Sequence, residues 1–78
     1  MAVPENFFDL TTSKFVAVRT WEVGTSALGY GETEATARDD SKSELFEEAF
    51  GKSDVVVWTD TGETAKRGEN TWKIYAKV

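Results

Sequence analysis

The sequence lacks cysteine and histidine and has a single proline among its 78 residues. The chain therefore has no disulfide framework, no zinc-finger ligand set, no thiol nucleophile and no imidazole base. It also lacks long apolar runs: the longest, residues 55–58, falls far short of the roughly 20 residues that cross a membrane. No charged segment followed by an apolar stretch marks a signal peptide at the N-terminus. We therefore expect a soluble cytoplasmic protein that does not enter a membrane.

What is present is an ordinary globular composition, 40% hydrophobic and 29% charged. A chain of this length builds one hydrophobic core, so we expect a single α+β domain over residues 1–78. Residues 1–13 form an N-terminal leader, and we expect it to pack on the body because its adjacent Phe7 and Phe8 are costly to leave in water. Pro4 suits the first position of a short helical turn that carries these side chains.

Strand signals are concentrated in three segments. β-branched and aromatic residues, which are typical of strands, fill residues 14–23, 54–60 and 71–78. Residues 24–31 hold three glycines and predict either a loop or a hairpin turn with a short second strand. The polar residues 61–70, with two glycines, predict a hairpin loop between the last two strands.

Residues 33–50 predict one long helix, with Thr33 as its N-cap and Gly51 just past its end. Small and apolar residues recur every four positions along it and form one stripe: Ala37, Ser41, Leu45 and Ala49. An alternative is open, because residues 41–44 have capping-box spacing; the helix would then cover only 42–50, after a strand at 32–38. The expected fold is α+β: a single helix packed on one face of a small, three- to four-stranded, mainly antiparallel sheet, in the order β-(β)-α-β-β.

Alternation along the strands assigns their two faces. Val16, Val18, Val55 and Val57 are assigned to the core that faces the helix. The opposite face then carries aromatic residues interleaved with basic ones: Phe15, Arg19, Trp21, Val56, Trp58, Lys73, Tyr75 and Lys77. An apolar patch of this size in water is typical of an interaction site. Three interpretations are open: the leader covers the patch, a second copy of the chain covers it, or a ligand or foreign partner binds it.

One segment carries the whole net charge of −5. Residues 32–48 hold seven acidic and two basic residues, whereas the rest of the chain is neutral, with seven of each. The candidate partner-binding carboxylates in the predicted helix are Asp39, Asp40, Glu44, Glu47 and Glu48. Such an array is either a solvated face that aids solubility or an imitation of a phosphate backbone that docks on a basic partner.

No motif in the chain assembles catalytic groups. Residues 60–62 (Asp-Thr-Gly) match the aspartic-protease triplet, but Trp58 and Thr59 stand before it where apolar pairs are usual, so we interpret it as a turn. The acidic residues lack the spacing of a calcium loop. Neighbouring carboxylates on a helix point in different directions and do not face each other across a cleft. We therefore predict no enzyme, no catalytic residue and no metal site.

Two stretches resemble known families. Residues 18–26, followed by a helix, residues 55–58 and a closing hairpin, resemble a dodecin. That resemblance implies a β-α-β-β fold, a hollow dodecamer and a flavin cofactor stacked on Trp58. Residues 29–33 (Gly-Tyr-Gly-Glu-Thr), leading into a helix, are similar to the strand-to-helix step of double-stranded-RNA-binding domains. Acidic residues follow where that family has basic ones, which argues against RNA-duplex binding.

These features predict a small acidic, non-enzymatic interaction module that binds a protein partner or a second copy of itself through the acidic helix, the aromatic sheet face, or both. Size and charge suit an inhibitor, for example a phage-type antagonist of a nucleic-acid-handling complex. One alternative is a dodecin-like flavin-binding oligomer, and another is a less favoured single-stranded nucleic-acid binder. In the latter, three aromatic side chains stack on bases and three basic ones contact phosphates: Trp21, Trp58 and Tyr75, and Arg19, Lys73 and Lys77.

Overall fold

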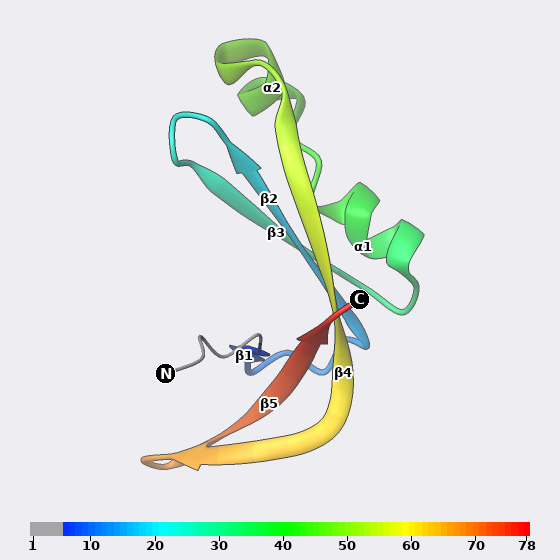
Figure 1. Cartoon of the computed structure of the whole chain (residues 1–78), viewed down its shortest axis with the longest axis vertical. Coiled ribbons are helices and arrows are strands. Elements are labelled where there is room, and N and C mark those ends of the chain that lie inside the picture. The colour runs from blue at the N-terminus through cyan, green and yellow to red at the C-terminus, as the bar shows by residue number, and fades with distance from the viewer. Residues whose placement is uncertain (1–5) are drawn as a thin grey trace.

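The computed structural model describes residues 6–78, with side chains from Leu10 onward except that of Arg67. In chain order the elements are β1 (Asn6–Asp9), β2 (Phe15–Trp21), β3 (Ser26–Gly31), α1 (Glu34–Asp40), α2 (Glu44–Phe50), β4 (Ser53–Arg67) and β5 (Asn70–Lys77). All strands join one antiparallel sheet in the order β1-β5-β4-β2-β3 (Figure 1). The fold is thus α+β, but the predicted single helix is wrong: two short helices separate the β2–β3 hairpin from the β4–β5 hairpin.

The helical segment divides because it contains two good N-caps. Thr33 caps α1 in a capping box, since its hydroxyl accepts the Thr36 N–H at 3.1 Å and the Thr36 hydroxyl accepts the Thr33 N–H. Ser43 caps α2 by accepting the Phe46 N–H at 3.2 Å. Gly51, with a φ of 85°, ends α2. Neither a helix over 33–50 nor a strand over 32–38 is formed.

The leader contributes a strand instead of the predicted helical turn. β1 pairs with β5, with Asn6 opposite Ala76 and Asp9 opposite Lys73; Pro4 lies outside the described residues. The segment after β1 then crosses towards β2, where the Tyr75 hydroxyl donates a 2.6 Å hydrogen bond to the carbonyl of Ser13. The leader and the last strand therefore hold each other in place.

The predicted loop over 61–70 is wrong, because β4 continues through it to Arg67 and the turn shrinks to two residues. Gly68, with a φ of 63°, takes the first turn position, as in a type II′ turn. The Asp-Thr-Gly triplet lies at the start of a bulge in β4, because Asp60 still pairs with Tyr75 and the register with β5 shifts between Asp60 and Thr64. The Gly62 N–H and the Lys73 ammonium both bond the Asp60 carboxylate and hold its pKa below the ordinary value.

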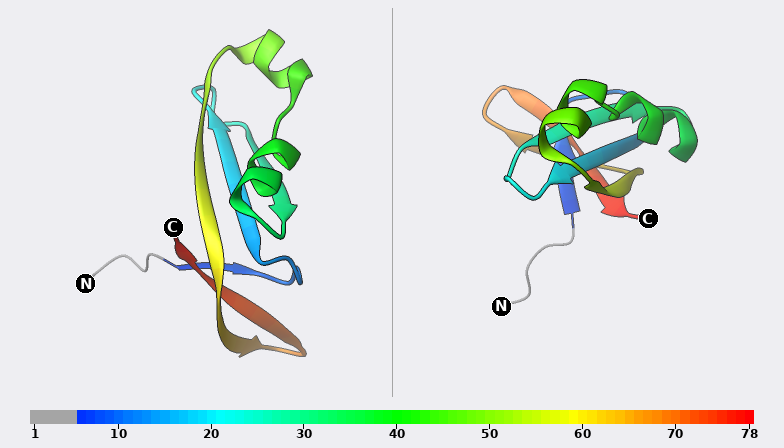
Figure 2. Two further views of the ribbon diagram at one scale, coloured as in Figure 1. Left: turned by 90° about the vertical axis from the view of Figure 1, so that its right-hand side faces the viewer. Right: turned by 90° about the horizontal axis from the view of Figure 1, so that it is seen from above.

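The bulge bends β4, so that β5 and β1 lie across the lower end of the molecule while β2 and β3 follow its upper half (Figures 1 and 2). Both helices lie on the same side of the sheet. Among the described residues, no helix has the length and apolar character needed to cross a membrane.

The face assignment is wrong for β2. Ala17, Ala37 and Val57 form the buried cluster between α1 and the sheet, with Phe15 and Val55 packed against it. The odd-numbered residues of β2 therefore face the helices, and the expected Val16 and Val18 lie on the other side. The alternation along β2 does not show which of its faces meets the helices, because its odd-numbered and even-numbered residues are both largely apolar.

The side of the sheet away from the helices is also closed in part. Val16 and Tyr75 are fully buried there. The segment before β2 supplies carbonyl oxygens to the Tyr75 hydroxyl from both Thr11 and Ser13. The sheet therefore has a small core on each face.

Candidate functional site

Helix α1 lies in direct contact with the backbone of β3. A Cβ atom on Gly29 would lie 2.3 Å from the carbonyl oxygen of Ala37 and 2.3 Å from the backbone nitrogen of Ser41. A Cβ on Gly31 would lie 2.2 Å from the hydroxyl oxygen of Thr36. The two glycines of the Gly-x-Gly step thus form the surface on which α1 packs, because only glycine leaves room for the helix backbone.

Arg19 fastens the end of α1 to the sheet. It is 8% exposed, and its guanidinium donates to the Ser41 hydroxyl at 3.1 Å, the Ser53 hydroxyl at 3.2 Å and the Arg38 carbonyl at 3.2 Å. Among the described residues no carboxylate pairs with it. The negative end of the α1 dipole, to which the Arg38 carbonyl belongs, lies against the positive charge instead.

The predicted aromatic and basic sheet face does not exist as one surface. Arg19 and Trp21 lie on the helix side, and Trp21 is 1% exposed. Trp58 and Tyr75 lie on the opposite side, as does Lys77, which is the β5 partner of Trp58. The remaining predicted members divide likewise: Phe15 lies on the helix side, and Val56 and Lys73 lie on the other. The three aromatics proposed to stack on bases therefore do not all lie on one face, and two of them, Trp21 and Tyr75, are buried.

The predicted carboxylates are all exposed, but they differ in their hydrogen-bond and ion-pair partners. Asp40 accepts the backbone N–H of Tyr30 at 2.9 Å, which satisfies the outer edge of β3. Asp39 pairs with Lys42 at 3.1 Å in an exposed i,i+3 ion pair. Among the described side chains, no ion pair neutralises the three carboxylates of α2, namely Glu44, Glu47 and Glu48. The free negative charge of the helical segment is thus concentrated on α2.

Helix α2 stands at the end of the sheet instead of on it (Figure 1). None of its seven residues is buried. It meets the body at an aromatic contact, in which the Trp21 and Phe46 rings lie edge-on with their centroids 5.2 Å apart. Phe50 packs against Phe46 in turn, with ring centroids 5.6 Å apart. The indole Nε1 of Trp21 has no hydrogen-bond partner although it is buried.

The outward part of α2 combines apolar and acidic side chains. Leu45 is 72% exposed and Phe50 is 39% exposed. We call this area the α2 surface and define it by Glu44, Leu45, Glu47, Glu48 and Phe50. The β2–β3 turn lies at the same end of the molecule and adds the exposed Val23 (Figures 1 and 2).

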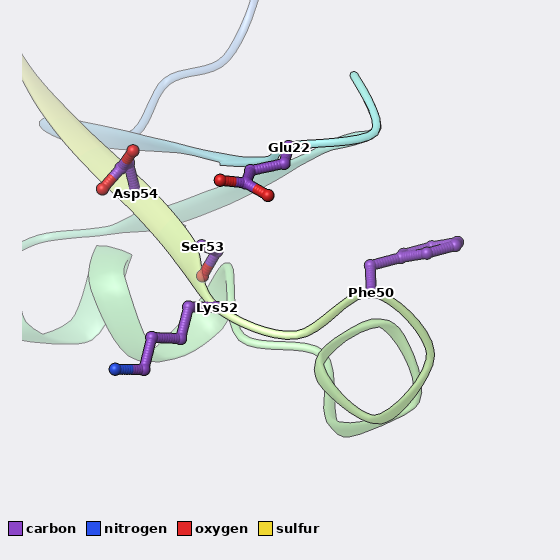
Figure 3. Close-up of a pocket in the computed structure, with 5 residues that line it drawn as sticks. All are labelled: Glu22, Phe50, Lys52, Ser53 and Asp54. Atoms are coloured by element: carbon purple, nitrogen blue, oxygen red, sulfur yellow. The ribbon is translucent and has the colours of Figure 1, made fainter.

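A hollow of about 340 Å³ opens at the rim of the α2 surface. Its walls are the end of β2, the end of α2 and the start of β4, which supply Glu22, Phe50, Lys52, Ser53 and Asp54 (Figure 3). In that view the Lys52 side chain extends away from the carboxylates of Glu22 and Asp54, and the Phe50 ring points away from them in another direction.

Sequence reasoning missed Leu45 as a surface residue because a continuous helix places it in the buried stripe. The signal was the pair of serines at 41 and 43, each able to cap a helix. Once the helix restarts at Ser43, Leu45 no longer continues the line through Ala37 and Ser41. Those two residues are buried as the stripe predicts, whereas Leu45 and Ala49 are exposed.

Comparison with models of protein families, with curated proteins and with solved structures finds no match to this chain. The dodecin resemblance implied a β-α-β-β order, which the structure overturns: three strands precede the helices, and there are two helices. The Gly-x-Gly step that resembled RNA-binding domains has a packing role under α1. Among the side chains that the structure describes, no three acidic groups gather closely enough to hold a metal ion.

Proposed function

We propose that this protein is a non-enzymatic interaction module that docks on a basic protein through the α2 surface. The observation that supports this is the exposure of Leu45 on a helix that buries none of its own residues. Helices of this size are stabilised in water mainly by burying an apolar face. A large apolar side chain presented to solvent by such a helix therefore favours a partner that covers it.

Charge defines the chemistry of that partner. Glu44 and Glu48 neighbour Leu45 on α2, Glu47 lies further round the helix, and no ion pair among the described side chains neutralises the three carboxylates. A complementary surface offers an apolar hollow ringed by lysine or arginine, because like charges across an interface cost free energy. Such surfaces commonly bind acidic or phosphate-bearing ligands. Occupying one would exclude its ligand, so we propose that the protein acts as an inhibitor.

The test is affinity capture with matched variants. The α2 variant carries Glu44→Lys, Glu47→Lys and Glu48→Lys, and the control variant carries Glu63→Lys and Glu69→Lys in the exposed β4–β5 hairpin. We expect to capture a basic protein that binds both the unmodified chain and the control variant. Its affinity for both should fall as the salt concentration rises. Binding should fall at least about a hundredfold with the α2 variant.

Three results would contradict the proposal. One is equal capture by the α2 variant and the control. Another is a solution mass of a dimer that Leu45→Ala converts to monomer, because a second copy would then occupy the α2 surface. The third is an oligonucleotide that binds the α2 variant as tightly as it binds the unmodified chain, because binding would then lie on another face.

A further inference from the structure

The side of the sheet away from the helices carries an ordered array of side chains. Residues that lie opposite each other on neighbouring strands share a face of the sheet, so the register of β3, β2 and β4 sets nine side chains in three rows. The upper row is polar, and the middle and lower rows are aliphatic and aromatic. From upper to lower, the rows are Ser26, Thr20 and Asp54; Leu28, Val18 and Val56; and Tyr30, Val16 and Trp58.

Neither helix covers the middle row. Both helices lie on the other side of the sheet, and β1 and β5 lie across its lower end (Figures 1 and 2). Leu28 is 44% exposed, and Val18 and Val56 are half-buried, whereas Val16 in the lower row is fully buried. A row of aliphatic side chains on the solvent side of a sheet is typical of a surface that another molecule covers.

The charges at the two ends of this face have opposite signs. Asp54 ends the upper row on β4, and Lys77 of β5 lies beside Trp58 of the lower row. Both charged side chains are exposed, and among the described side chains neither takes part in an ion pair. Along β4, Val56 lies midway between Asp54 and Trp58, about 7 Å from each. Half a turn about the middle row therefore exchanges the acidic end with the basic end.

We propose that two copies of this chain pack face to face through Leu28, Val18 and Val56, with the twofold axis of the dimer along this row. Asp54 of each copy then approaches Lys77 of the other, so both charged pairs form in one symmetric complex. With the axis along the strands instead, both Asp54 carboxylates would lie at one end and would repel each other. The face is therefore complementary to itself in one orientation, with the strands of the two copies running in opposite directions.

The size of the face sets the strength of the dimer. Three strands about 4.8 Å apart and three rows about 7 Å apart span roughly 15 by 20 Å. Permanent interfaces are larger, since even standard ones bury about 800 Å² on each partner. The dimer is therefore weak and reversible. It leaves the α2 surface at the end of the sheet free, and it does not depend on the proposed function.

The experiment is sedimentation equilibrium of the intact chain. We expect the average mass to rise from that of one chain to that of two between about 10 µM and 1 mM, with a dissociation constant of about 100 µM. Leu28→Lys sets a charge in the middle row and should weaken the dimer at least about tenfold. Val23→Lys is the matched control, because Val23 is exposed in the β2–β3 turn outside the three rows, and it should leave the dimer unchanged.

Charge exchange tests the orientation of the two copies. Asp54→Lys and Lys77→Asp should each weaken the dimer about tenfold, because each variant brings two pairs of like charges together. Mixing the two single variants in equal amounts restores both attractive pairs and should restore the affinity to within about threefold. Glu63→Lys in the β4–β5 hairpin is the matched charge control and should leave the dimer unchanged.

The mass of a single chain at every concentration would overturn the dimer, and so would equal association by Leu28→Lys and Val23→Lys. Single charge variants that remain monomeric when mixed would overturn the orientation. If Leu28→Lys does not fold, the charge exchange decides alone. Leu45→Ala separates this dimer from the proposed function: association lost with that variant alone would place the second copy on the α2 surface and overturn both. A dimer that persists in Leu45→Ala, alongside capture unaffected by the α2 variant, would overturn the proposed function only.

Discussion

The two helices of this protein are seven residues long each and follow one another in the chain, yet they relate to the sheet in opposite ways. Helix α1 rests directly on the glycine backbone of β3, and Arg19 fastens its end. Helix α2 meets the body where the Phe46 ring contacts Trp21, and none of its residues is fully buried. Length therefore does not decide how a helix packs; the residues of the sheet beneath it do. α1 belongs to the scaffold, and α2 is presented by it.

The largest effect we predict comes from adding a methyl group at Gly29, where α1 packs directly on β3. Gly29→Ala places a methyl group against the helix backbone, which cannot give way as a flexible side chain does. We expect a loss of about 3 kcal/mol in the free energy of unfolding, measured by urea denaturation.

Gly24→Ala is the matched control for that substitution. Gly24 has a φ of 93°, and a methyl group added there would meet no atom within 4 Å, so only backbone strain opposes the change. A loss of about 1 to 2 kcal/mol is expected there. Equal losses at Gly24 and Gly29 would mean that the close approach of α1 contributes nothing special.

A smaller effect is expected from replacing Arg19, the β2 residue that bonds the end of α1 just before α2 begins. Arg19→Met removes three hydrogen bonds and leaves the Ser53 hydroxyl and the end of α1 less satisfied. We expect about 2 kcal/mol less stability by urea denaturation. Arg38→Met alters an exposed side chain and should cost no more than about 0.5 kcal/mol. A neutral result at Arg19 would show that α1 is held by packing alone.

The smallest effect on global stability is expected on α2, where the effect on local order is the informative one. Phe46→Ala removes the ring that meets Trp21, and an isolated helix of this size does not persist in water. We expect about 1 kcal/mol of lost stability, with faster amide exchange in α2 and unchanged exchange in α1. Leu45→Ala, on the exposed side, should leave both unchanged. Faster exchange in α1 as well would show that the two helices form one cooperative unit.

The strand content of the fold was readable from the sequence, but its use of faces was not. β-branched and aromatic residues marked β2, β4 and β5 because such side chains pack well on a pleated surface. In β2, however, Phe15 and Ala17 alternate with Val16 and Val18, so both faces are apolar. The choice depended on which face α1 could approach. The glycines of β3 determine that face, because they let α1 pack against it. The periodicity of a single segment does not reveal such a contact between two segments.

The candidate site divides in the same manner. The carboxylates of α2 were found from charge alone, since a segment with seven acids and two bases must be solvated. Leu45 was not, because its exposure follows from a helix break that depends on competition between caps at Ser41 and Ser43. The split of Trp21 from Trp58 likewise followed from the face of β2. Local chemistry was predictable, and the juxtaposition of distant residues was not.

The pairing of β1 with β5 sets the order in which this sheet can be assembled. Asn6 must find Ala76, and Tyr75 must find the carbonyl of Ser13, so these contacts join segments more than 60 residues apart. The β2–β3 hairpin and α1 need only local contacts and can form early, whereas contacts between distant segments form slowly. During synthesis, β1 waits as an unpaired strand until β5 leaves the ribosome. The first strand of the sheet to be made is therefore the last to be folded.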